Sequence, residues 1–311
     1  MTKMIATRDA YGEALKELGR INKDVVVLDA DLSGSTKTAV FKKEYPERFF
    51  NVGIAEQNLM GTAAGLATAG KLPFASTFAM FASGRAFEII RNSICYPNLN
   101  VKIAATHAGI TVGEDGATHQ ALEDISLMRS LPNMVVLSPA DGVEAKQCIY
   151  KAAEHNGPVY IRLGRSKIPV IFDENYKFEI GKGVELKKGN DIALIATGIM
   201  LEKALVAAEE LSKEGISARV INISTIKPID EDIIIKAAKE TKGIVTVEEH
   251  SIIGGLGSAV TEVVSENAPT YVERIGTMDV FGESGDGNEL LEKYGLNVKN
   301  IIDKSKKILS K

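Results

Sequence analysis

The chain has 311 residues, of which 45% are hydrophobic and 25% charged, and its formal net charge is −4. This balance excludes the strongly basic surface that binds a nucleic-acid backbone or an anionic membrane, and the length is typical of about two domains. The opening MTKMIATRDA predicts no secretory or transit peptide, and no run reaches the roughly 20 apolar residues that span a bilayer. We therefore expect a cytoplasmic protein with no nucleic-acid or membrane partner.

The first half of the chain alternates short apolar runs with segments of helical spacing. The runs are nearly continuous, which is typical of strands covered on both faces; they lie at 25–31, 72–78, 101–107, 134–140 and 158–164. Strand followed by helix, repeated, predicts an α/β fold with a doubly wound, mainly parallel sheet. We assign this first domain to residues 1–165.

The alternation stops at residues 166–190, which are rich in lysine and turn residues and contain no amphipathic helical pattern. We interpret this segment as the linker between domains. Apolar runs then resume at 191–198, 216–224, 244–250 and 271–276, again with helical patterns between them. A second, smaller α/β domain is predicted for residues 191–311.

One segment, THAGITVGEDGATHQ, concentrates polar side chains at the end of a predicted strand. His107 and His119 bracket it, and Glu114 and Asp115 lie between glycines. Because α/β sheets bind ligands at the carboxyl ends of their strands, the segment is a candidate site, although a polar turn would have a similar composition. The short ligand spacings of zinc sites are absent, so no metal site is predicted from these residues.

Two glycine-rich segments could suggest phosphate or metal binding. Gly285-Asp286-Gly287 precedes what looks like the first turn of a helix, and we interpret it as a turn. Gly254, Gly255 and Gly257 lack the full dinucleotide spacing, so they predict a tight strand-to-helix connection. The two cysteines, Cys95 and Cys148, lie in apolar surroundings and are expected to be buried thiols.

Four motifs in this order resemble the pyrimidine-binding domain of transketolase, a thiamine diphosphate enzyme: NVGIAEQNL, STFAMF, THAGITVGEDGATHQ and YIRLGRSKIP. The second half resembles the C-terminal domain of that family. The family's magnesium- and diphosphate-binding domain has no counterpart in this sequence. The resemblance therefore implies a split enzyme, in which this chain is the C-terminal subunit and a separate N-terminal subunit holds Mg2+ and the cofactor diphosphate. A heterotetramer of the two subunit types is expected.

The resemblance also implies residue roles around the cofactor. The glutamate matching Glu56 hydrogen-bonds a ring nitrogen of the aminopyrimidine and relays a proton that activates the cofactor. Phe78 and Phe81 match the aromatic residues that stack on this ring, with Gly84 near the place where the family often has a third. Asp31 matches an acid near the cofactor at the subunit interface.

Further roles concern the sugar. Asp115 is expected to bond the hydroxyl next to the substrate carbonyl, and His119 to lie near the reacting carbon. Four residues match the positions that hold the sugar phosphate: Arg8, Ser35, His107 and Arg165. Of these, Arg8, Ser35 and Arg165 taken singly are each typical of a surface residue. The implied reaction transfers a two-carbon ketol unit from a ketose phosphate to an aldose phosphate.

Three alternatives remain at this point. The 1-deoxyxylulose-5-phosphate synthases share related segments, but His107, His119 and Arg165 favour transketolase. The beta subunit of a 2-oxo acid dehydrogenase is another split relative, and the GEDGATHQ segment fits it poorly. A non-catalytic assembly module could keep the fold without chemistry, but it would not need Glu56, Asp115 and both histidines together.

Overall fold

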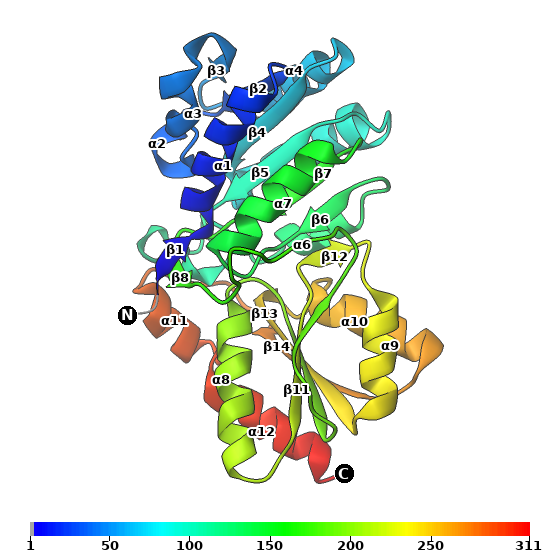
Figure 1. Ribbon diagram of the computed structural model, residues 1–311. Coiled ribbons are helices and arrows are strands. Elements are labelled where there is room, and N and C mark those ends of the chain that lie inside the picture. Colours follow the sequence, from blue (N-terminus) through cyan, green and yellow to red (C-terminus); the bar gives the residue numbers. More distant parts are fainter. Residues whose placement is uncertain (1–2) are drawn as a thin grey trace.

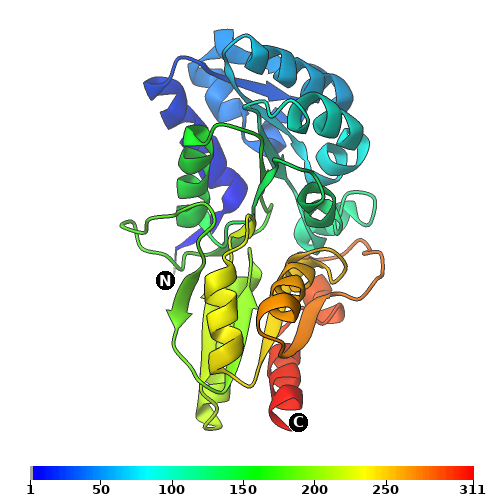
Figure 2. The ribbon, with the colours of Figure 1, turned by 90° about the vertical axis from the view of Figure 1, so that its right-hand side faces the viewer.

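The computed structural model describes residues 3–311 as two α/β units stacked end to end (Figures 1 and 2). The first unit contains a seven-stranded sheet, in which every pairing is parallel except that of the strand from the second half of the chain, which is antiparallel. Its strand order is β12 (Thr225–Lys227), β6 (Val135–Leu137), β7 (Val159–Arg162), β5 (Lys102–Thr106), β4 (Leu72–Phe78), β2 (Val25–Asp29) and β3 (Phe49–Asn51).

Helices cover both faces of this sheet. In β2, the side chain of Val25 lies in a core with α1 (Thr7–Ile21) and α7 (Gly142–Glu154). Its neighbour Val26 lies in a second core with α4 (Glu56–Thr68). Because successive side chains of a strand point to opposite faces, a strand that is apolar throughout needs cover on both sides. The predicted doubly wound α/β fold is confirmed.

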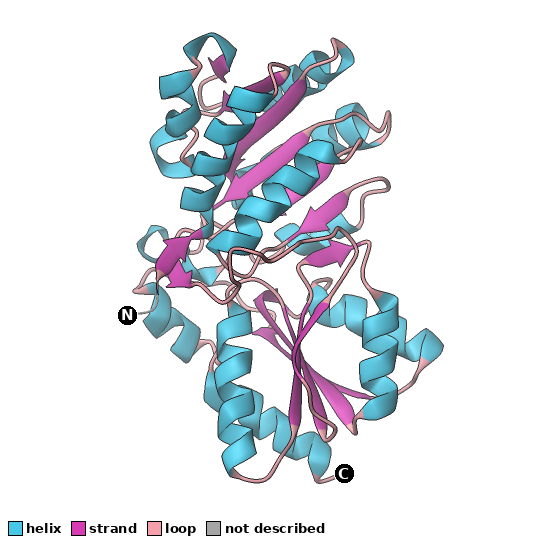
Figure 3. Cartoon of the chain, viewed as in Figure 1, coloured by secondary structure: helices cyan, strands magenta, loops and turns pink. Residues whose placement is uncertain are grey.

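The second unit has a smaller sheet of five strands. Its order is β14 (Tyr271–Thr277), β13 (Gly243–Ser251), β10 (Ile192–Ala196), β11 (Ala218–Asn222) and β9 (Val184–Lys187), and only β9 is antiparallel to its neighbour. Helices lie on both sides of this sheet, as Figure 3 shows: α8 (Met200–Lys213) and α12 (Val298–Leu309) pack on one side, α9 (Glu231–Glu240) and α10 (Leu256–Asn267) on the other.

The remaining elements are short. They are β1 (Met4–Ala6), α2 (Ser33–Thr36), α3 (Ala39–Glu44), the 3-10 helices η1 (Pro46–Arg48) and η4 (Ile110–Asp115), the π-helices η2 (Phe81–Arg85) and η3 (Ile90–Cys95), α5 (Phe87–Ile89), α6 (Asp124–Arg129), β8 (Lys167–Pro169) and α11 (Gly287–Lys293). Within residues 3–311, the helices are all too short or too polar to cross a bilayer.

The two units interlock where the sequence predicts a linker. Residues 166–190 contain no helix, but β8 pairs with β1 and β9 joins the second sheet. In return, β12 joins the first sheet beside β6. One apolar core runs across the junction and includes Ile125 of α6 and Ile223, which precedes β12. The boundaries at residues 165 and 191 stay a prediction, because strands from both sides of them are exchanged.

Both cysteines are free and buried, as expected from their apolar neighbours. Burial raises the pKa of the Cys95 thiol to about 11 and raises that of Cys148 well above its usual value. A thiol that stays protonated is a poor nucleophile and a poor metal ligand. Cys95 and Cys148 are therefore packing residues.

Candidate active site

The predicted site residues meet at one edge of the first sheet. Phe78 ends β4, His107 directly follows β5, and Arg165 follows β7 by three residues. These strands are parallel neighbours or nearly so, and their carboxyl ends therefore share an edge. Asp31 and Ser35 follow β2 at the same edge.

Glu56 is the first residue of α4, and its side chain is only 2% exposed. Its carboxylate oxygen Oε2 accepts a hydrogen bond of 2.8 Å from Nη1 of Arg85. Arg85 is not among the residues predicted from the sequence. The available signal was its position four residues after Phe81, about one helical turn, which places an arginine and an aromatic ring on one side of a helical segment.

Four rings, two of phenylalanine and two of histidine, form one cluster. Phe78 and Phe81 are stacked, with centroids 6.0 Å apart and an interplanar angle of 15°. The ring of His107 stacks on Phe78 at 3.9 Å, and the ring of His119 meets Phe81 edge-on at 5.3 Å. At Gly84, near the place where the family often has a third aromatic, a Cβ atom would lie 3.0 Å from the Met80 side chain. The Arg85 guanidinium lies over the Phe81 ring, 5.1 Å from its centroid.

His107 is neutral and has a defined tautomer. Burial, together with the nearby Arg8, lowers its pKa to about 3. Arg8 has only donors and lies 3.0 Å from Nε2, so Nε2 accepts, and Nδ1 carries the proton that is donated to the Thr106 hydroxyl at 2.9 Å. The imidazole of His107 is therefore uncharged, and both of its nitrogens are engaged within the chain.

Arg8 connects the histidine to the loop after β2. Its Nη1 also donates to the backbone carbonyl of Ser35 at 3.0 Å, so Ser35 contributes a carbonyl here. Among the described residues, the buried Nε of Arg8 has no hydrogen-bond partner. Burial lowers the pKa of this guanidinium. A buried cationic donor without a partner is costly, and an anionic ligand would satisfy it.

The remaining predicted residues lie at the rim. The carboxylate of Asp115 is 44% exposed and lies 3.9 Å from Nη1 of Arg165, which instead donates to Glu114 at 2.9 Å and to the carbonyl of Val112 at 2.5 Å. Asp31 is exposed, and Asn51 donates to its carboxylate at 2.8 Å. The structure thus brings Glu56, the two phenylalanines, the two histidines and Arg8 together, with Asp31, Asp115 and Arg165 around them.

A buried polar network supports the His107–His119 loop from the second unit. The Glu249 carboxylate, at the end of β13, accepts the backbone N–H of Thr111 at 2.7 Å. Arg162 of β7 donates to the Asp124 carboxylate at 2.9 Å and to the Glu249 carbonyl at 2.8 Å. Tyr160 also donates to Asp124, at 2.8 Å. Glu249, in the run VEEH of the second unit, thus positions a loop of the first unit. This role could not be predicted from the sequence, because only the fold brings Glu249 and the loop together.

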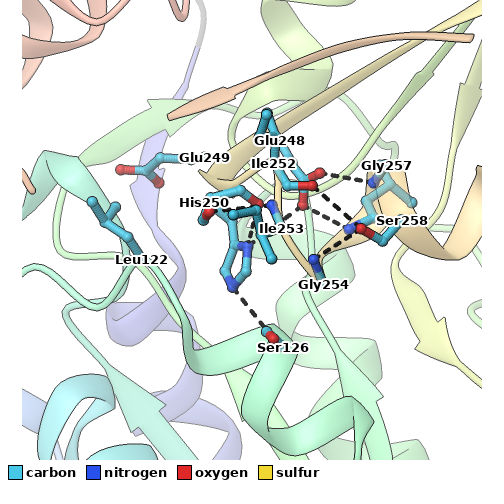
Figure 4. A network of polar contacts seen from close by, with 12 residues as sticks. Leu122, Ser126, Glu248, Glu249, His250, Ile252, Ile253, Gly254, Gly257 and Ser258 are labelled. Atoms are coloured by element: carbon cyan, nitrogen blue, oxygen red, sulfur yellow. Dashed lines mark hydrogen bonds and ion pairs between the residues drawn. The ribbon is translucent and has the colours of Figure 1, made fainter. Parts of the chain in front are cut away.

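Glu248 and His250, the chain neighbours of Glu249, lie together beside the glycine-rich connection between β13 and α10 (Figure 4). The Glu248 carboxylate accepts the backbone N–H groups of Leu256 and Gly257, the first residues of α10, at 2.6 and 2.7 Å. A Cβ atom on Gly255 would lie 2.0 Å from this carboxylate. The glycines therefore make a tight strand-to-helix connection, as predicted, and an internal carboxylate takes the place that a phosphate could occupy.

The second glycine-rich segment is also a local turn. The Asp286 side chain accepts the backbone N–H groups of Asn288 and Glu289 at the start of α11, which is an N-cap. Within residues 3–311 there is no group of three or more His, Cys, Asp or Glu side chains placed to hold a metal ion.

Glu248→Gln is expected to change how stability depends on pH. Burial raises the pKa of Glu248 to about 7 and lowers that of His250 to about 4. Between pH 4.5 and 6.5, Glu248 and His250 together bind one proton in the folded protein, on Glu248, and one proton in the unfolded chain, on His250. Because folding then changes the number of bound protons by about zero, these two groups give the free energy of unfolding no pH dependence in this range. In the variant only His250 remains, and its unfolded form binds the extra proton. The free energy of unfolding should then rise with pH over this window by up to roughly 3 kcal/mol relative to the unchanged chain.

Urea unfolding at pH 4.5, 5.5 and 6.5, at one protein concentration, measures this difference. Glu266→Gln, at an exposed position of α10, is the control and should follow the unchanged chain at every pH. Parallel curves for Glu248→Gln and the unchanged chain would contradict the proton assignment.

The site of this α/β protein has a carboxylate, stacked rings and a buried arginine at the carboxyl edge of a parallel sheet, an arrangement that suits a planar small molecule with an anionic group. The chain matches the family model of the transketolase pyrimidine binding domain over residues 3–170 and that of the transketolase C-terminal domain over residues 181–301. It therefore belongs to the transketolase family.

Individual proteins to which the chain is similar are also described as transketolases or transketolase subunits. The chain is 57% identical over 307 residues to a Methanocaldococcus jannaschii protein described as a transketolase C-terminal section, with 96% of both chains covered. It is 43% identical over 295 residues to a 6-deoxy-6-sulfo-D-fructose transketolase subunit of a Clostridium species, covering 95% of this chain and 92% of that one. A solved split gene transketolase, described as an inactive β4 tetramer, matches with a TM-score of 0.93 and 60% identity, covering 98% and 99% of the two chains.

Proposed function

We propose that this chain is the C-terminal subunit of a thiamine diphosphate-dependent transketolase that is active only with a separate N-terminal subunit. The reaction is transfer of a two-carbon ketol unit from a ketose phosphate to an aldose phosphate. The observation that carries the proposal is the buried Glu56 carboxylate beside the stacked rings of Phe78 and Phe81. The description of one relative as a C-terminal section and of another as split gene supports a partner subunit.

The residues present fit the aminopyrimidine half of the cofactor. The stacked phenylalanines offer an apolar face to a planar ring, and the Glu56 carboxyl offers a buried polar group at its edge. When bound, thiamine diphosphate supplies the nucleophilic carbon that carries the ketol unit. We assign Mg2+ and the diphosphate mainly to the partner subunit, in a heterotetramer of two subunit types.

Each residue then has a role. Glu56 hydrogen-bonds the ring nitrogen and relays a proton, Phe78 and Phe81 hold the ring, and Asp31 lies near the cofactor at the subunit interface. His119, edge-on to Phe81, faces the reacting carbon. Asp115 bonds the hydroxyl next to the substrate carbonyl. The phosphate group of the sugar lies among Arg8, Ser35, His107 and Arg165. There the Nε of Arg8, which has no hydrogen-bond partner in the described residues, can donate to an anion.

A reconstitution assay tests the function. The purified chain is mixed with its N-terminal partner, thiamine diphosphate and Mg2+, and ketol transfer is followed from xylulose 5-phosphate to ribose 5-phosphate. Turnover should require both subunits. Tight assembly without turnover would favour the alternative, a non-catalytic assembly module, and formation of a deoxyxylulose phosphate from pyruvate and glyceraldehyde phosphate would favour the synthase. Cytoplasmic location stays a prediction.

Replacing His107 or Arg165 by Ala should chiefly raise the KM for phosphorylated sugars, by about tenfold. Arg165→Ala removes an anion contact directly, and His107→Ala removes the Nε2 acceptor that holds Arg8, so each weakens ground state and transition state alike. Initial rates over a range of donor concentrations measure KM and kcat separately. The control is an unphosphorylated ketose, whose KM should change less than about twofold, since it offers these residues no anion. An equal increase for both substrates would refute the phosphate-anchor role.

A further inference from the structure

The Glu56 carboxylate already has a partner in this chain, and that partner covers the proposed cofactor face. Nη1 of Arg85 lies 2.8 Å from the carboxylate, and its guanidinium carbon lies 5.1 Å from the centroid of Phe81. Phe81 is in turn stacked on Phe78. One side chain therefore occupies both the acid and the aromatic surface that we assign to the aminopyrimidine ring.

The chemistry of the two occupants is alike. A guanidinium is planar, stacks on aromatic rings and donates hydrogen bonds to a carboxylate from its edge. The guanidinium takes one of the two carboxylate oxygens, Oε2, and one face of the Phe81 ring. A planar ring that hydrogen-bonds Oε2 and stacks on that face cannot bind while Arg85 is there, so in this pose the two exclude each other.

We propose that Arg85 is a latch on the cofactor site, which holds Glu56 and Phe81 in the free chain and must swing away before thiamine diphosphate binds. This inference rests on the proposed function. It assigns Arg85 to the regulation of cofactor binding, as a residue that competes with the cofactor for Glu56.

The local structure suits such a movement. Arg85 ends the π-helix η2, and the next residue, Ala86, has φ −100° and ψ 10°, outside helical geometry. A π-helical turn takes in one more residue than an α-helical turn, which changes the direction of the side chain at its end. The Arg85 side chain is 52% exposed, whereas that of Glu56 is 2% exposed. Arg85 can therefore turn into solvent without opening the core, and Glu56 stays in place.

A fixed partner would have the opposite effect. If Arg85 stayed beside Glu56 in the assembled enzyme and held the carboxylate in position, its removal would weaken cofactor binding. Competition and support thus predict opposite changes in the dissociation constant of the cofactor. This constant can be measured without turnover.

The experiment uses the assembled complex of this chain with its N-terminal partner subunit, in excess Mg2+. Isothermal titration calorimetry with thiamine diphosphate gives the Kd for the unchanged complex, Arg85→Ala, Arg85→Gln and Arg91→Ala. Arg91, an exposed residue of η3, is the matched control, because its Nη1 donates to Asn92 and not to Glu56. Circular dichroism and melting confirm that each variant is folded.

The latch predicts that Arg85→Ala and Arg85→Gln bind thiamine diphosphate about tenfold more tightly, as expected when a charge-assisted hydrogen bond no longer has to be broken. Arg91→Ala should bind as the unchanged complex does. In a Glu56→Gln background, the gain from Arg85→Ala should shrink to less than about twofold, since the charge that holds the latch is gone.

Each other outcome overturns the latch. An unchanged or larger Kd for both Arg85 variants, with normal binding by the unchanged complex, would refute the latch and leave the proposed function in place. A gain that persists undiminished in the Glu56→Gln background would show that Arg85 does not act through Glu56. No binding of thiamine diphosphate by the unchanged complex would overturn both the proposed function and the latch.

Discussion

Glu56→Gln in the assembled enzyme is expected to lower kcat by about 10²- to 10⁴-fold, the usual effect of losing an acid–base group, while thiamine diphosphate still binds. The amide has the size of the carboxyl and fills the same place at the start of α4, but it cannot relay a proton. Its surroundings hold it firmly, because the side chain is 2% exposed. Steady-state turnover with saturating cofactor and sugars measures kcat, and calorimetry measures cofactor binding.

The control for this experiment is Glu88→Gln. Glu88 lies on α5 in the segment that follows Arg85, and its exposed carboxylate accepts a hydrogen bond from Asn92. Its replacement should leave kcat within about twofold of the unchanged enzyme, as is usual for an exposed position away from the chemistry. If Glu56→Gln kept turnover close to that of Glu88→Gln, proton relay by Glu56 would be wrong.

The largest expected effect on stability comes from Arg162→Met. The guanidinium of Arg162 is the cation beside Asp124, whose side chain is 0% exposed. Methionine fills much of the volume but leaves a buried carboxylate without its charge partner, and such a loss destabilises a protein by about 3–5 kcal/mol. Urea unfolding followed by far-ultraviolet circular dichroism, at equal protein concentrations, measures the free energy of unfolding.

Two further variants make this prediction specific. Adding Asp124→Asn to Arg162→Met removes the unpaired charge and should recover part of the lost stability. Lys146→Met breaks an exposed pair with Glu17, whose side chains are 40% and 47% exposed, and should cost less than about 1 kcal/mol. Equal losses for Arg162→Met and Lys146→Met would mean that burial of the Asp124 pair has no special weight.

The same network could not be found in the sequence. Tyr160, Arg162 and Asp124 lie within or beside predicted elements, but Glu249 is 138 residues from Thr111 along the chain. No local pattern connects a carboxylate in VEEH with a backbone N–H in THAGITV. The contact exists because the two units interlock through β12 and share a core. Long-range polar contacts of this kind depend on the packing of whole units.

The position of the site in the fold could be predicted from the sequence more readily. Phe78 and His107 end apolar runs and Arg165 follows one, and the rule that strand ends share an edge predicts that they meet. The structure places them there. The atomic contacts within the site could not be predicted from the sequence. Ser35 accepts a hydrogen bond from Arg8 through its carbonyl, and Arg165 donates to Glu114 and to the carbonyl of Val112.

The α/β class, the covered parallel strands and the family could be predicted from the sequence, because apolar periodicity and the ordered motifs are local properties of the chain. The sequence also predicted that both glycine-rich segments are turns. The tertiary structure alone decided that Arg85 covers Glu56 and Phe81, that His107 is neutral, and that Glu249 of the second unit holds the loop of the first. These depend on distances, burial and hydrogen-bond partners, which arise only when residues far apart in the chain are packed together.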